Sequence, residues 1–146
     1  MILDFFAKKK LEFTDIFNIF ANMVKLLLLM LLAHIADDFY LQGILANMKQ
    51  KRWWEHSEWY KPLYRDDYRM ALLIHSMSWS IMILLPYIVL YNISGLMLFG
   101  AFITNAVIHY YVDDLKANKG QINLVVDQSI HIGQVIVTWM TLWQWV

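Results

Sequence analysis

Residues 23–45 read MVKLLLLMLLAHIADDFYLQGIL, an apolar run with three charged side chains, at Lys25, Asp37 and Asp38. About 20 mostly apolar residues are enough for a helix to cross the roughly 30 Å hydrocarbon core of a bilayer. Because the bilayer core offers no water, such a segment must satisfy its own backbone hydrogen bonds and is predicted to be helical. This run therefore predicts a transmembrane helix.

Three further apolar runs follow, at residues 70–93, 96–112 and 122–146. The run at 96–112 reaches a membrane-crossing length only when its polar end, through Lys116, is included. Short links separate the last three runs, which favours antiparallel neighbours. We therefore predict an all-α membrane protein, a bundle of four antiparallel transmembrane helices over about 23–46, 69–92, 95–116 and 122–145.

The first 20 residues alternate apolar and charged side chains, a pattern typical of an amphipathic helix in the membrane interface, and no function of its own is expected for it. The chain thus divides into an N-terminal helix, residues 1–20, and a transmembrane domain, residues 21–146. A polar, aromatic loop over 47–68 joins the first two spans. Basic residues are concentrated on the side of this loop, so the positive-inside bias places it in the cytoplasm of a multi-pass protein.

The composition excludes several classes of protein. Of the 146 residues, 60% are hydrophobic, above the usual value of about 45–50% for soluble domains. The chain has no cysteine, which excludes a disulfide scaffold and a thiolate metal site. Its 12 basic and 12 acidic residues balance, which argues against a nucleic-acid binder. The lipid bilayer is the partner that the composition predicts, and the oligomeric state stays open.

Ionisable side chains interrupt the predicted spans, although an Asp at the centre of a span costs about 2.5–3.5 kcal/mol on insertion. They are His34, Asp37, Asp38, His75, His109, Asp113, Asp114, Lys116, Asp127 and His131. Three His and Asp pairs are four residues apart, and residues at i and i+4 share a helix face. These pairs are His34 with Asp38, His109 with Asp113, and Asp127 with His131.

The alternating direction of the predicted spans brings these faces to one depth. His75 lies six residues inside its span from Arg69, roughly 9 Å, and the pair in the first span lies in its loop-side half. His109 lies seven residues before Lys116, roughly 10 Å, and Asp127 begins the last span from the same side. We therefore predict a convergent polar site in the loop-side leaflet.

Imidazole nitrogens and carboxylate oxygens without thiolates suit Zn²⁺, Mn²⁺ or Fe²⁺. Without a cation, the carboxylates would repel one another or take up protons. We predict one or two divalent ions, with zinc preferred and manganese or iron as alternatives. The predicted ligands are His34, Asp38, His109, Asp113, Asp127 and His131. As catalytic residues we predict His75, a general acid or further ligand, and Lys116, which would stabilise developing negative charge. Gln42 and Gln128 are expected to contact the ligands or the substrate.

Single residues have simpler interpretations. His75 could be a packing residue with one hydrogen bond, because polar side chains also join helices within membranes. Asp37 and Asp114 are expected to face water or lipid headgroups. Asp113 and Lys116 could form an interfacial ion pair. Three His–Asp pairs in one layer favour metal binding over these alternatives.

The order of the polar motifs resembles that of a known family. The chain has HIADDFYLQ at 34–42, the isolated His75, HYYVDDLK at 109–116 and DQSIH at 127–131. This is similar to the HxxxDFxLQ, H, HxxxDxxK and DQxxH pattern of domain-of-unknown-function family 3307, a group of small bacterial and phage membrane proteins. The resemblance covers all four predicted spans.

Residue by residue, the resemblance selects His34, Asp38, Gln42, His75, His109, Asp113, Lys116, Asp127, Gln128 and His131. It favours Asp38 over Asp37, a choice that spacing alone leaves open. The loop over 47–69 looks like an elaboration outside the pattern. The resemblance implies a shared polar site and no particular reaction.

Three functions fit such a site. The first is a membrane-embedded, metal-dependent hydrolase whose metal-bound water attacks a lipid-like or phosphorylated small-molecule ester. The second is a metal-ion or proton transporter or channel, because buried His and Asp residues also mark ion pathways. The third is a non-catalytic phage or bacterial membrane module with a structural polar or metal site. The second span is almost wholly apolar from Ile81 to Ile88, which favours a one-sided site over a pore.

Overall fold

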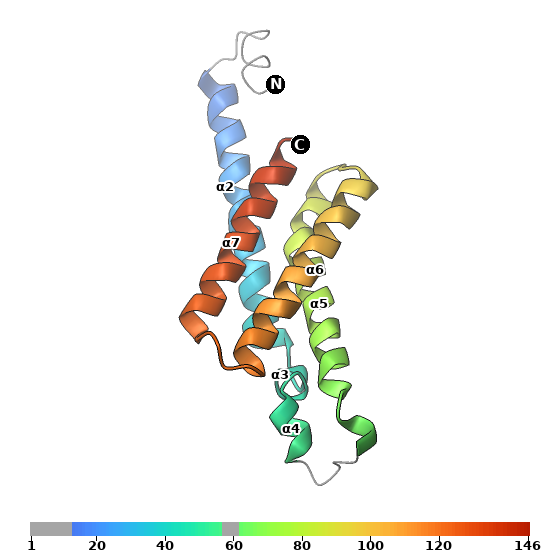
Figure 1. The fold of residues 1–146 in the computed structure, drawn as a ribbon. Coiled ribbons are helices and arrows are strands. Elements are labelled where there is room, and N and C mark those ends of the chain that lie inside the picture. The colour runs from blue at the N-terminus through green and yellow to red at the C-terminus, as the bar shows by residue number, and fades with distance from the viewer. Residues whose placement is uncertain (1–12, 57–61) are drawn as a thin grey trace.

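The computed structural model describes residues 13–56 and 62–146, and within these ranges it contains helices and no strand (Figure 1). Four long helices dominate the described chain. The helices are α2 (Phe13–Ile35), which continues as a π-helical turn (Ala36–Leu41), α3 (Leu45–Met48), α4 (Lys51–Glu55), a 3₁₀ turn (Pro62–Tyr64), α5 (Asp67–Leu90), α6 (Gly95–Ala117) and α7 (Leu124–Trp143). The predicted all-α class is therefore correct for the described residues.

The four long helices pack in a closed ring. Helix α5 packs against α2 and α6, and α7 packs against the same two helices from the other side. Their directions alternate, so that the start of α2 and the end of α7 lie at the end of the bundle opposite α3 and α4 (Figure 1). Every long helix can therefore contribute one face to a shared interior, which runs the length of the bundle.

Three helical segments in the described ranges are long and apolar enough to cross a membrane: Phe13–Leu41, Pro62–Leu90 and Gly95–Ala117. The prediction of four spans is therefore supported for three. Helix α7 is 20 residues long, but polar side chains from Asp127 to Gln134 lower its overall apolar character. Its local start is clear, because the side chain of Asn123 accepts a hydrogen bond from the N–H of Val126 (3.0 Å) and caps the helix.

The first long helix begins earlier than predicted. Residues 13–20 were expected to belong to a separate interfacial helix, yet they form the first turns of α2, which continues unbroken to Ile35. No Pro or Gly interrupts this segment, so the backbone has no local reason to end a helix at residue 20. The helical path ends before Gly43, whose φ of 52° turns the chain toward α3. The rest of the predicted N-terminal helix, residues 1–12, lies outside the described residues.

The interior of the bundle has two layers. Near the end opposite α3 and α4, it is an apolar core of buried side chains: Leu26, Met30, Ile83, Leu84, Tyr87, Ile93, Val135 and Leu142. Nearer α3 and α4, the buried side chains are mainly His and Asp. Large apolar side chains such as Leu32 and Val137 are exposed on the outside of the bundle, as expected for a surface that faces lipid.

The apolar core generates a stability prediction. Leu26 is fully buried, and Leu28, two residues along the same helix, is 54% exposed. We predict that Leu26→Ala lowers the free energy of unfolding by about 2 kcal/mol, at the low end for Leu→Ala, because lipid is as apolar as the core and only packing is lost. Thermal unfolding in detergent, followed by circular dichroism, measures this. Leu28→Ala is the matched control, and an equal loss in both variants would contradict the packing described.

Candidate metal centre

Each of the four long helices contributes side chains to one buried cluster, which we call the His/Asp cluster. Among the described residues it contains His34, Asp38, His75, His109, Asp113, Asp127 and His131, and each of these side chains is at most 5% exposed. The six predicted metal ligands are all in this set, together with His75. The depth argument from the sequence therefore correctly predicts that these residues lie close together. Their contacts differ from one residue to the next.

The first subset of the cluster joins three helices. The Nε2 atom of His75 lies 3.3 Å from Oδ1 of Asp38 and 3.0 Å from Nε2 of His109. Nε2 of His109 lies 3.9 Å from the same oxygen of Asp38. One ligand atom from each of the three residues lies within 4.8 Å of the others, which is close enough for the group to hold one metal ion.

The second subset contains His109, Asp113 and His131, whose ligand atoms also lie within 4.8 Å of one another. Oδ1 of Asp113 is 3.3 Å from Nε2 of His131, and Oδ2 of Asp113 is 3.8 Å from Nε2 of His109. The imidazole rings of His109 and His131 stack with their centroids 4.0 Å apart. His109 belongs to both subsets, and within the described chain these are the two groups that could hold a metal.

Two predicted ligands lie in the cluster but outside both subsets. Nδ1 of His34 accepts a hydrogen bond from the indole N–H of Trp79 (2.8 Å), so this nitrogen is already occupied. Oδ2 of Asp127 accepts a hydrogen bond from the ammonium of Lys116 (2.5 Å), and its Oδ1 lies 3.5 Å from Nε2 of His131. His34 and Asp127 therefore contact the surroundings of the two groups without belonging to either.

The two predicted glutamines lie where the sequence places them, beside the carboxylates. The side-chain amide of Gln128 donates to Oδ2 of Asp38 (2.9 Å) and to Oδ2 of Asp127 (3.0 Å), and so joins the start of α7 to the end of the first span. Gln42 donates to Oδ1 of Asp38 (3.2 Å) and also to the backbone carbonyl of Asp38. Asp38 is thereby held from two sides.

Asp37 corrects the sequence prediction. It was expected to face water or headgroups, but it is 2% exposed and accepts a hydrogen bond from the hydroxyl of Ser78 (2.8 Å). Its Oδ2 atom lies 3.7 Å from Nδ1 of His75. The physical reason is the π-helical turn, which holds more residues per turn than an α-helix and brings both adjacent Asp side chains inward.

Asp114 lies apart from the cluster. It accepts hydrogen bonds from the side chains of Lys119 (2.9 Å) and Asn118 (2.9 Å), and its side chain is 15% exposed. The hydrogen bond and the negative charge of Asp114 raise the pKa of Lys119, which is exposed in the link after α6. This pair holds the end of α6 to the link that follows it.

Lys49 is the residue that sequence reasoning missed most clearly. It follows α3, is 7% exposed, and its ammonium donates a hydrogen bond to Oδ2 of Asp113 (2.5 Å). The side chain of Asn118 donates to the carbonyl of Lys49 (3.2 Å) and accepts from the N–H of Lys51 (2.7 Å), which fixes the segment over the end of the bundle. In the sequence, Lys49 is one of several basic residues in a polar loop, and nothing in its spacing distinguishes it.

Trp79 was also not predicted, although its spacing from His75 indicates that it lies on the same helix face. It is four residues after His75, on the same face of α5, and it is fully buried. Besides donating to His34, its ring stacks on the imidazole of His109 with centroids 4.3 Å apart. Trp79 also belongs to the apolar core, so its ring lies where the core meets the cluster. There it contacts imidazoles from two other helices.

Polar contacts continue a short way beyond the cluster. Oε1 of Gln134 lies 3.1 Å from Nδ1 of His131, and the amide of Gln134 donates to Oδ1 of Asn105 (3.3 Å). The amide of Asn105 donates to the hydroxyl of Thr138 (2.8 Å). Past Thr138 the interior is the apolar core, with side chains such as Ile83 and Leu84. Within the described ranges, the polar side chains of the interior therefore extend to the α3–α4 end of the bundle and give way to the apolar core in the other direction.

The charges of the cluster do not balance. Among residues 13–56 and 62–146, the cluster region contains the buried carboxylates of Asp37, Asp38, Asp113 and Asp127, the buried ammonium of Lys49 and the partly exposed ammonium of Lys116. With neutral imidazoles, two negative charges remain without a partner, and an unpaired buried charge is strongly unfavourable. One divalent cation would neutralise them, and so would protons on His75 and His131, whose Nε2 atoms each lie 3.3–3.5 Å from two carboxylates. The donor set of imidazole nitrogen and carboxylate oxygen fits such an ion.

The fold and the cluster together define a class: an all-helical bundle with membrane-length helices and a buried group of residues that could hold a metal. Within that class, the chain belongs to the DUF3307 family of proteins of unknown function, whose sequence model matches residues 26–146. The family predicted from the motif order is thereby confirmed, and the match contains every residue of the cluster. No curated protein and no solved structure matches the chain.

The buried pair of Lys49 and Asp113 generates a prediction. Lys49→Met should lower the free energy of unfolding by about 3 kcal/mol, because it leaves the Asp113 carboxylate buried without its cation. Adding Asp113→Asn should restore part of this loss, since the uncompensated charge is then gone. Unfolding in detergent, followed by tryptophan fluorescence, measures both. Lys51→Met, which removes an exposed partner of Glu55, is the control and should cost less than about 0.5 kcal/mol. A loss in the double variant that equals or exceeds the sum of the single losses would contradict the pairing.

Proposed function

We propose that the protein is a membrane-embedded, metal-dependent hydrolase with one divalent ion bound by His109, Asp113 and His131. The observation that carries this is the convergence of these three ligand atoms within 4.8 Å at full burial, beside an excess of negative charge. Three protein ligands with one open position are the usual arrangement of catalytic zinc. Manganese and iron(II) are alternatives for the same donors.

The choice of this subset over the other rests on the remaining contacts. Nε2 of His109 faces both subsets, and one imidazole nitrogen binds one ion, so the two groups compete for it. With the ion bound at Asp113 and His131, His75 is not a ligand and stays available for proton transfer. Its Nε2 atom then remains 3.3 Å from Oδ1 of Asp38. A second ion would need a further bridging ligand, such as a carboxylate or hydroxide.

The proposed reaction is hydrolysis of an ester, with a phosphoester as the preferred class. A divalent ion held by His109, Asp113 and His131 would supply Lewis-acid activation of a water molecule for attack on the ester. His75 donates a proton to the leaving oxygen as its bond breaks. Lys116, whose side chain is 29% exposed, lies at the more open side of the cluster, where its ammonium stabilises negative charge on the substrate. A site at this depth favours a lipid-like substrate, and a soluble phosphorylated molecule would enter from the α3–α4 side.

The proposal includes a membrane arrangement. Helix α7 is the fourth span, antiparallel to α6, and the α3–α4 end of the bundle faces the cytoplasm, because basic residues are concentrated on that side. The bilayer is the surrounding partner, and no nucleic-acid partner is proposed.

A second candidate function is transport of a metal ion or protons. The hydrogen-bonded series from His131 through Gln134 and Asn105 to Thr138 supports it, because it extends the polar interior toward the opposite end. The apolar core beyond Thr138 would have to open for an ion to cross. A third candidate, a non-catalytic module in which the cluster fixes helix packing, predicts no turnover and loss of folding when the cluster is mutated.

Metal content tests the proposed ligands. We predict that the detergent-purified protein, reconstituted with Zn²⁺, holds one equivalent, and that His109→Ala and His131→Ala lose it. His75→Gln should retain it, because His75 is assigned to proton transfer. Elemental analysis measures the stoichiometry. His56→Ala, in an exposed turn after α4, is the control. Wild-type protein without stoichiometric metal would overturn the metal centre, and metal loss in His75→Gln would overturn the choice of subset.

Turnover tests the hydrolase. We predict that the metal-loaded protein cleaves an aryl phosphoester, and that Lys116→Met lowers kcat by about 10²–10³ with its metal content unchanged, because charge stabilisation in the transition state is lost. Lys119→Met is the control, since Lys119 pairs with Asp114 outside the cluster. Absence of cleavage of phosphoesters and carboxylic esters by folded, metal-loaded protein would contradict the hydrolase. Ion flux in proteoliposomes would then distinguish transport from a structural role.

A further inference from the structure

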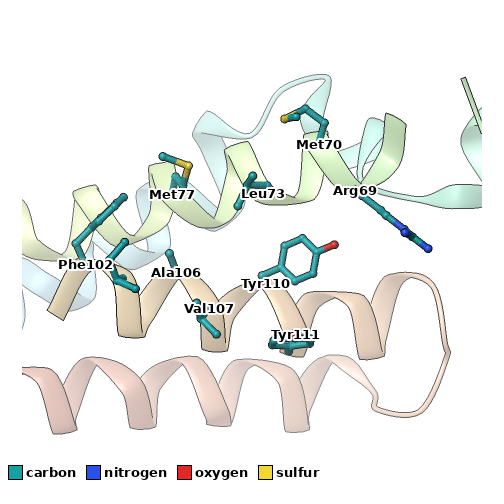
Figure 2. Close-up of a pocket in the computed structure, with 10 residues that line it drawn as sticks. Arg69, Met70, Leu73, Met77, Phe102, Ala106, Val107, Tyr110 and Tyr111 are labelled. Carbon is teal, nitrogen blue, oxygen red and sulfur yellow. The ribbon is translucent and has the colours of Figure 1, made fainter. Parts of the chain in front are cut away.

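A groove lies on the outside of the bundle, between α5 and α6, and it contains no residue of the His/Asp cluster (Figure 2). Its walls are apolar side chains such as Leu73 and Met77 of α5 and Ile103 and Val107 of α6. Ala106, which is 6% exposed, lies between them, and its small side chain leaves the groove hollow. Both helices belong to segments that are long and apolar enough to cross a membrane, so the groove would open toward lipid.

One end of this groove is polar. Arg69 and the hydroxyl end of Tyr110 lie together at the end nearest the start of α5 (Figure 2). The Nε atom of Arg69 donates to the hydroxyl of Tyr68 (3.2 Å) and lies 3.6 Å from Oδ1 of Asp66. Arg69 remains 63% exposed, so its guanidinium can still reach a ligand. The groove thus has apolar walls along most of its length and a polar end. At that end Arg69 carries a positive charge, and Asp66 beside it carries a negative charge.

The dimensions fit one lipid chain. From Arg69 to Met77, α5 rises roughly 12 Å from the polar end toward the middle of the span. A concave surface contacts an acyl chain from more than one side, and these weak contacts add up along its length. A convex helix surface elsewhere on the bundle offers contact from one side only. The groove is therefore a better site for a retained chain than a convex helix surface.

We propose that this groove binds a zwitterionic phospholipid, with one acyl chain along α5 and α6 and the phosphate at Arg69. The planar guanidinium donates two parallel hydrogen bonds to phosphate oxygens, which makes Arg well suited to this group. Asp66 beside Arg69 accepts from the ammonium of a phosphatidylethanolamine headgroup. The pairing of both charge signs at the polar end favours this headgroup over an anionic one. The site is independent of the proposed hydrolase.

Native mass spectrometry of the full chain tests the proposal, with the protein exchanged into detergent micelles that contain a defined lipid. We expect one phosphatidylethanolamine retained per chain, with less phosphatidylglycerol and little diacylglycerol, which lacks the phosphate. Arg69→Gln should reduce the retained fraction at least about tenfold, the loss expected for one hydrogen bond to a charged group. Val107→Trp should reduce it similarly by filling the groove.

Two matched controls separate the groove from the general surface. Arg65→Gln removes an exposed Arg that also pairs with Asp66 but does not line the groove. Val137→Trp adds the same ring at an exposed position of α7. Both variants should retain lipid as the wild type does. Retention of diacylglycerol equal to that of phosphatidylethanolamine would overturn phosphate recognition by Arg69. If the protein instead forms a dimer without bound lipid, and Val107→Trp disrupts that dimer, the lipid proposal is wrong. The groove would then be the contact with a second copy of the chain.

Discussion

The carboxylate of Asp113 is the contact on which the interior of the bundle depends. Its Oδ2 atom accepts from Lys49 and lies 3.4 Å from Nε2 of His75, and its Oδ1 atom lies 3.3 Å from Nε2 of His131. One side chain of α6 thereby joins the segment after α3, helix α5 and helix α7. A charge at 1% exposure is tolerated only when it is paired, so these partners must be held in place together. The packing of α5, α6 and α7 and the pairing of this carboxylate therefore depend on one another.

Much of the cluster was predictable from the sequence, because helix periodicity and span direction act over known distances. Spacing of four residues placed His109 with Asp113 and Asp127 with His131, and the alternating direction of the spans placed both pairs at one depth. Lys49 could not be found in this way, since a loop has no periodicity from which a side-chain direction follows. Asp37 was misplaced because the prediction assumed an α-helix where the backbone forms a π-helical turn. The earlier start of α2 was missed because its charged first turns resemble an interfacial helix.

The division of the interior into two layers limits what the protein can do. Toward one end of the bundle the polar layer passes through Gln134, Asn105 and Thr138 and then meets the apolar core, and at the other end it meets the segment that carries Lys49. A ligand from the α3–α4 side therefore meets lysine side chains before it meets the imidazoles. This order suits an anionic group, which is attracted first and positioned afterwards.

The π-helical turn at the end of α2 places two carboxylates beside the imidazole ring of His75 on α5. Asp37 faces Nδ1 of His75 at 3.7 Å, and the next residue, Asp38, faces Nε2 of the same ring at 3.3 Å. In an α-helix, consecutive side chains point about 100° apart. Two adjacent carboxylates are then less readily directed at the two nitrogens of one imidazole than in the wider π-helical turn. The contact of Nε2 with Asp38 is short enough for a hydrogen bond, whereas Oδ2 of Asp37 has no hydrogen-bond partner and faces Nδ1 at a longer distance. A small widening of one backbone turn thus places a carboxylate near each nitrogen of His75, so that a half-turn of the ring about its own axis would leave a carboxylate beside both nitrogens.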